Sequence, residues 1–131
     1  ANLSINRGDR FLLAISGGVD SMVMLDMFWK LGLHVEVAHI NHSTRDGGSD
    51  GDMQFVQERC EKYDIPFHSK ILNYTKLSEG NFQENARNER FSFLKKVAQK
   101  QDSQWIATAN HQDDEKIILY IRFWILPKMI Y

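Results

Sequence analysis

The chain has 131 residues, of which 43% are hydrophobic and 25% are charged, a composition typical of one globular domain and not of a disordered or fibrous segment. The formal net charge of -1 singles out neither a nucleic-acid nor a membrane partner, and no apolar stretch approaches the roughly 18 residues of a membrane span. The single cysteine, Cys60, excludes an internal disulfide and a multi-thiolate metal site, and it predicts a reducing, cytoplasmic compartment.

The first elements that we expect are a strand, a glycine turn and a helix. The apolar run FLLAI predicts a strand over residues 10–15, and Ser16, Gly17 and Gly18 form the turn. From Val19 onward apolar residues recur at helical spacing, and Gly32 stands where a terminal glycine ends such a helix. The apolar face of this helix is expected to carry Met22, Leu25, Phe28 and Trp29.

A second strand is expected over residues 34–40, and a polar loop rich in glycine and aspartate follows it. Asp50 or Asp52 can cap the next helix, which carries Phe55, Val56 and Cys60. This helix must stop before Pro66, because the residue that precedes a proline disfavours the helical conformation. A third strand is expected over residues 67–72.

The longest helical pattern covers residues 82–100 and places Phe91, Leu94, Val97 and Ala98 on one face. A fourth strand over residues 104–109, a polar turn over residues 111–114 and a last helix over residues 117–125 complete the prediction. Strands that alternate with helices predict an α/β fold, a parallel sheet with helices on both faces. In such sheets ligands bind beyond the carboxyl ends of the strands.

The segment SGGVDS, residues 16–21, lies between the first strand and the first helix. Two glycines allow a tight turn whose N–H groups can hold a phosphate at the positive end of the helix. Because no lysine accompanies the loop, backbone and hydroxyl groups would hold the phosphate, and Asp20 is available for Mg²⁺. The alternative is an ordinary glycine-containing connection.

Three further groups can carry chemistry. His39 and His42 follow the second strand and can reach a phosphate or an adenine, or they are simply solvated. Arg87 lies four residues before Phe91, on the expected apolar face of the helix. A guanidinium there needs an anionic partner, because an unpaired charge on such a face is costly, and the partner is either a carboxylate of the protein or a substrate phosphate. Asp113 and Asp114 follow the fourth strand, where they can bind Mg²⁺ or cap a helix.

Four segments in this order resemble one family. SGGVDS resembles the pyrophosphate-binding loop of the N-type ATP pyrophosphatases, the PP-loop superfamily. Residues 39–45 (HINHSTR), 81–91 (NFQENARNERF) and 108–114 (TANHQDD) resemble the HxNHxxR, ExxARxxRY and TAHHxDD segments of bacterial tRNA(Ile)-lysidine synthetases. The resemblance implies an adenine-nucleotide alpha-hydrolase-like fold, and we expect residues 1–131 to form a single, incomplete domain of this type.

This resemblance also implies an activity. The family uses ATP, with Mg²⁺, to adenylate the C2 oxygen of the wobble cytidine of tRNA(Ile), and free lysine then displaces AMP. It implies no membrane partner and leaves a homodimer open. The residues that it assigns to ATP are Ser16, Gly17, Gly18, Val19, Asp20, Ser21, His39 and His42. The residues assigned to catalysis are Asp114, Arg87 and Asp20, and those assigned to the metal are Asp20 and Asp114. Arg87 and Arg90 are assigned to tRNA, and Lys95 and Lys96 are added to them because their helix is the most basic continuous stretch of the chain.

Two positions depart from the family pattern. Asn110 replaces the first histidine of the TAHHxDD segment, and Ile117 replaces an acidic residue associated with the chemistry. An isoleucine can neither bind a metal nor move a proton. Two alternative functions therefore stay open: another PP-loop adenylating enzyme, such as a tRNA thiolase or an amidotransferase partner, and a nucleotide-binding module without activity.

Overall fold

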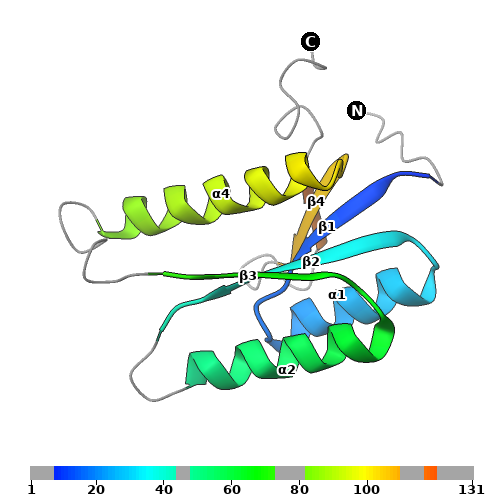
Figure 1. Ribbon diagram of the computed structural model, residues 1–131, viewed down its shortest axis with the longest axis horizontal. Coiled ribbons are helices and arrows are strands. Elements are labelled where there is room, and N and C mark those ends of the chain that lie inside the picture. Colours follow the sequence, from blue (N-terminus) through cyan, green and yellow to red (C-terminus); the bar gives the residue numbers. More distant parts are fainter. Residues whose placement is uncertain (1–7, 44–47, 73–81, 110–116, 121–131) are drawn as a thin grey trace, which may run out of the picture.

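A computed structural model describes residues 8–43, 48–72, 82–109 and 117–120 of the chain. The elements are β1 (Arg10–Ala14), α1 (Val19–Lys30), β2 (His34–Asn41), α2 (Gly48–Tyr63), β3 (Phe67–Ile71), α4 (Phe82–Lys100), β4 (Trp105–Ala109) and β5 (Ile117–Tyr120). The strands form one sheet in the order β3-β2-β1-β4-β5. Helices α1 and α2 cover one face of the sheet and α4 covers the other (Figure 1), which confirms the predicted α/β fold.

The apolar core is split into two layers by the pleat of the sheet. Along β1, Phe11 and Leu13 belong to the cluster that also holds the buried side chains of α1 and α2. Leu12, between them, belongs to the cluster under α4, together with Leu94. Because successive side chains of a strand point to opposite faces, β1 is buried on both sides, as expected of a central parallel strand.

Helix α1 ends where the sequence predicts. Gly32 has a φ of +72°, the left-handed conformation in which glycine follows a helix at little cost. The predicted apolar face is correct for Met22, Leu25 and Phe28, which are buried. Trp29, in contrast, is 42% exposed and stacks on Tyr63 of α2, with ring centroids 3.9 Å apart. Trp29 therefore joins two helices instead of entering the core.

Helix α2 begins earlier than predicted. It starts at Gly48, so Asp50 and Asp52 lie inside the helix and the prediction that either one caps it is wrong. Asp50 instead accepts a hydrogen bond of 2.8 Å from Nδ2 of Asn41, which ties the first turn of α2 to the end of β2. An acidic residue in this turn also favours the helix, because it faces the positive end of the helix dipole.

The predicted last helix is also wrong. Residues 117–120 form β5, which pairs antiparallel with β4 and makes the sheet mixed instead of purely parallel. A short apolar run fits a buried helix and a strand equally well by periodicity, and the open edge of β4 offers a row of hydrogen-bonding groups that a strand can satisfy. Residues 121–125 and the predicted polar turn at 111–114 lie outside the described residues. No helix in the described segments is long and apolar enough to cross a membrane.

Cys60 reports on the integrity of this core. Its side chain is 1% exposed, and burial raises the pKa of the thiol to about 11. Since the thiolate is the reactive form, we expect the native chain to react with a thiol reagent such as Ellman's reagent far more slowly than the chain unfolded in guanidinium. One thiol per chain should be titrated after unfolding. Fast stoichiometric labelling of the native chain at pH 8 would contradict the placement of α2.

Candidate functional site

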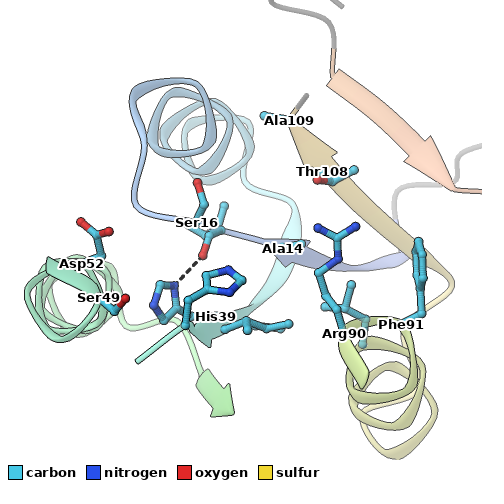
Figure 2. A pocket seen from close by; sticks show the side chains of 14 residues that line it. Ala14, Ser16, His39, Ser49, Asp52, Arg90, Phe91, Thr108 and Ala109 are labelled. Atoms are coloured by element: carbon cyan, nitrogen blue, oxygen red, sulfur yellow. Dashed lines mark hydrogen bonds between the residues drawn. The ribbon is translucent and has the colours of Figure 1, made fainter. Parts of the chain in front are cut away.

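A pocket of about 510 Å³ opens at the carboxyl ends of β1, β2 and β4. The chain runs from β1 to β2 and β3 on one side and then returns to β4 on the other, so the pocket lies where the strand order reverses. Such switch points are where open α/β sheets bind ligands. Figure 2 shows Ser16, His39, Arg90 and Thr108 around this pocket, with Ser49 and Asp52 of α2 beside them.

The loop after β1 contains a position that favours glycine. Gly17 has a φ of +97°, a conformation that residues with a side chain rarely adopt. A Cβ atom added there would also lie 3.2 Å from Cβ of Asp52, which is a tight contact. Gly18 has a φ of -73°, which any residue can adopt, and stands at the N-cap of α1. The tight turn that the two glycines predict thus depends on Gly17.

Two serines hold the loop in shape. Ser21 Oγ accepts a hydrogen bond from the N–H of Gly17 (3.2 Å) and donates one to the carbonyl of Gly18 (3.0 Å). Ser16 Oγ accepts a hydrogen bond from the N–H of Gly18 (3.2 Å). The hydroxyls thus engage the glycine N–H groups that the sequence assigned to a phosphate. The first turn of α1 follows directly, and the positive end of the helix dipole favours an anion there.

The two histidines of the second strand have different surroundings. His39 is 1% exposed, and its Nδ1 donates a hydrogen bond of 2.8 Å to the carbonyl of Ile15. Its Nε2 is buried and has no hydrogen-bond partner among the described residues. His42 lies at the rim of the pocket, where partial burial and the charge of Arg90 lower its pKa. His42 therefore presents a neutral imidazole at neutral pH.

Helix α4 brings Arg90 to the pocket and leaves Arg87 outside its lining. Arg87 is exposed, so the prediction that it lies on the buried apolar face is wrong. Leu94 of α4 lines the pocket, and Arg90 lies one turn from it whereas Arg87 lies two turns from it toward the start of the helix. Arg90 is also exposed, so both arginines differ in their place along α4 and not in burial. Both guanidinium groups lie over the ring of Phe91, at 5.5 Å for Arg87 and 5.3 Å for Arg90.

The structure brings together only part of the predicted site. The predicted residues that line the pocket are Ser16, His39, His42 and Arg90. The rest of the loop adjoins it, whereas Arg87, Lys95 and Lys96 lie elsewhere on α4. Asn110, Asp113 and Asp114 lie outside the described residues. In the part of the chain that the structure describes, no group of three or more His, Cys, Asp or Glu side chains can hold a metal ion.

Sequence reasoning did not assign Ser49, Asp52, Phe91 and Thr108 to the site, although all four line the pocket. A signal existed for Thr108, which stands at the carboxyl end of β4, where ligands are expected. No comparable signal existed for Asp52, because its place beside Gly17 depends on the packing of α2 against the loop.

Comparisons with known proteins agree with this geometry. The family model described as a PP-loop domain matches residues 2–124. A tRNA(Ile)-lysidine synthase of Clostridium tetani is 35% identical over 118 residues, which are 85% of this chain and 25% of that protein. The same-named protein of Petrotoga mobilis is 37% identical over 116 residues, 83% of this chain and 37% of the relative. The chain thus spans about a quarter to a third of these relatives.

A solved structure also resembles the chain. The NMN synthetase from Francisella tularensis superposes with a TM-score of 0.54 over 73% of this chain and 43% of that one. The two sequences are 21% identical, so this likeness concerns the fold alone.

Proposed function

The chain belongs to the PP-loop domain family, and from this membership we propose that it is the ATP-binding part of a tRNA(Ile)-lysidine synthase. The observation that carries the proposal is the loop at Gly17, where the left-handed backbone favours glycine and which leads directly into the first turn of α1. This arrangement suits the phosphates of a nucleotide, with the nucleoside in the pocket.

Charge at the site favours the same ligand. Arg90 lines the pocket from α4, and the positive end of α1 follows the loop that begins at the pocket-lining Ser16, so that both can face phosphate oxygens. We assign Mg²⁺ to Asp20, in the first turn of α1, together with Asp114. When bound there, Mg²⁺ would neutralise charge on the departing pyrophosphate. We further propose that residues 1–131 belong to a single, incomplete PP-loop domain and that the protein is cytoplasmic.

The proposed reaction follows the family. ATP activates the C2 oxygen of the wobble cytidine, and the amine of free lysine then displaces AMP. The first step makes the second easier, because an oxygen bonded to AMP leaves far better than a bare carbonyl oxygen. The cations of α4, Arg87, Lys95 and Lys96, lie outside the pocket lining and can attract the tRNA backbone.

We expect residues 1–131 by themselves to bind ATP with Mg²⁺ but to form no measurable lysidine. Lysine transfer requires the wobble base to be held at the activated phosphorus, and the chain spans only about a quarter to a third of the matched relatives. Calorimetric titration with ATP measures the first part of this prediction. Incorporation of radiolabelled lysine into a tRNA(Ile) transcript measures the second, and efficient incorporation would overturn it.

The assignment to lysidine synthesis is tested by a chimera. In it, this chain replaces the matching residues of the Petrotoga mobilis relative, with and without Ile117→Glu. We expect lysidine from the Ile117→Glu chimera and much less from the unaltered one, because only the former restores the acidic side chain of the family pattern. If both chimeras bind ATP and neither forms lysidine, the lysidine assignment is wrong, and a nucleotide-binding module without this activity is the better description.

A further inference from the structure

We propose that His39 is a positioning residue: it fixes the phosphate-binding loop through the carbonyl of Ile15, and its Nε2 forms no hydrogen bond with the nucleotide. This inference rests on the proposed ATP site. It concerns the hydrogen bonds that join β2 to the start of the loop after β1.

The hydrogen bonds of Ile15 place the imidazole at the point where the sheet ends and the loop begins. The parallel ladder of β1 and β2 ends with the pair Ala14 and Ala38. Ile15, the next residue, donates its N–H to the carbonyl of Ala38 at 3.0 Å, and its own carbonyl accepts Nδ1–H of His39 at 2.8 Å. Both polar backbone groups of Ile15 are therefore bonded to β2, immediately before Ser16.

The state of the imidazole follows from its partners. Because a carbonyl only accepts hydrogen bonds, Nδ1 must carry the proton, and in the neutral ring Nε2 is then an acceptor. That Nε2 is buried and without a partner among the residues described, so a nucleotide in the pocket cannot reach it in this conformation. The remaining side of the ring faces Phe67 of β3, with centroids 6.3 Å apart.

Burying an acceptor without a partner is unfavourable, so an apolar side chain would be the simpler choice for this position. It would, however, leave the carbonyl of Ile15 without its donor. The position of Ile15 matters because Gly17, two residues further on, has no spare room against Asp52 and Val56. A shift of the loop at Ile15 would therefore displace the first turn of α1, where we place the phosphates.

Two substitutions separate the positioning role from a contact with ligand. In His39→Asn the amide nitrogen is as far from Cβ as Nδ1 is, so the hydrogen bond to Ile15 can be kept. In His39→Gln the amide nitrogen takes the place of Nε2, and the bond is lost. We expect the affinity for ATP to fall by less than about threefold in His39→Asn and by about tenfold or more in His39→Gln.

Melting temperatures show whether each variant folds. Both variants should melt below wild type, because asparagine leaves a cavity and glutamine leaves the carbonyl of Ile15 without its donor. ATP affinity is therefore measured at a temperature at which both variants are folded, and a difference in affinity that persists there reports on the loop and not on overall stability. His68→Gln, on the neighbouring strand and outside the pocket lining, is the matched control and should leave the affinity unchanged.

The outcomes distinguish failure of the proposed function from failure of the positioning role of His39. If wild-type protein does not bind ATP, the proposed function fails and the inference fails with it. If wild-type protein binds ATP and His39→Gln binds at least as well as His39→Asn, the proposed function stands and the positioning role is wrong. Tight binding by His39→Gln with weak binding by His39→Asn would mean that Nε2 contacts the ligand.

Discussion

Replacing Gly17 with alanine is expected to weaken ATP binding by at least about tenfold, because a non-glycine residue in the left-handed region costs about 1–2 kcal/mol before any contact is counted. The added Cβ would also lie 3.2 Å from Cβ of Asp52, so either the loop or the start of α2 must shift. Both structures border the pocket, and a shift of either one alters the phosphate site. Calorimetric titration with ATP and Mg²⁺ measures the loss.

Gly18→Ala is the matched control for this substitution. Gly18 adjoins Gly17, but its φ of -73° suits any residue. We expect nearly wild-type affinity in Gly18→Ala and a melting temperature within a few degrees of wild type, since a surface change without strain alters stability by roughly 0.5 kcal/mol or less. Equal affinity in Gly17→Ala and wild type would show that the loop is not the phosphate site. Equal losses in both variants would show that the constraint is not specific to Gly17.

Removing the side chain of Arg90 is expected to produce the second large effect, a loss of about tenfold or more in ATP affinity, because a guanidinium facing a phosphate in a partly enclosed site makes charge-assisted hydrogen bonds. Arg90 lines the pocket and contacts the ring of Phe91, which limits its freedom before the ligand arrives. Titration of Arg90→Ala with ATP and Mg²⁺ measures this loss.

Arg87→Ala supplies the comparison, because Arg87 contacts the same ring and is exposed outside the pocket lining. We expect Arg87→Ala to bind ATP like wild type. In contrast, binding to tRNA should weaken in two variants, Arg87→Ala and the double variant Lys95→Ala, Lys96→Ala. Its dependence on salt should also become flatter, because the slope of log binding constant against log salt concentration falls by about one for every phosphate that the protein no longer neutralises. If Arg87→Ala lowers ATP affinity and Arg90→Ala does not, the orientation of α4 described above is wrong.

Periodicity in the sequence predicted the parts of the fold that depend on local pattern. Short apolar runs predicted the four parallel strands, helical spacing predicted the three helices of the described residues, and the conformational freedom of Gly32 predicted the glycine that follows α1. The alternation of strands and helices implied a parallel sheet with ligands beyond the carboxyl ends of its strands, where the pocket lies, but it did not give the strand order.

Tertiary packing determines the features that the sequence pattern leaves open, such as the type of one element and the placement of single site residues. The run at residues 117–120 is equally apolar as helix or strand, and pairing with the free edge of β4 makes it a strand. Arg87 and Arg90 lie on the same side of α4 as Leu94, and only the placement of the helix along the sheet brings Arg90 to the pocket and leaves Arg87 one turn beyond it. Likewise, Gly17 and Gly18 look alike in sequence, and only the structure distinguishes them, through the left-handed φ of Gly17 and the approach of Asp52.

The most direct test of the ATP site is an NMR titration of the ¹⁵N-labelled chain with a non-hydrolysable ATP analogue and Mg²⁺. We predict the largest amide shifts at Val19, Asp20 and Ser21 in the first turn of α1, with smaller shifts at residues that line the pocket, such as Arg90 and Thr108. Residues at the amino ends of the strands, such as Arg10 and Gln104, should not respond. Saturable shifts centred on those amino-end residues, or none in the first turn of α1, would contradict an ATP site at this loop.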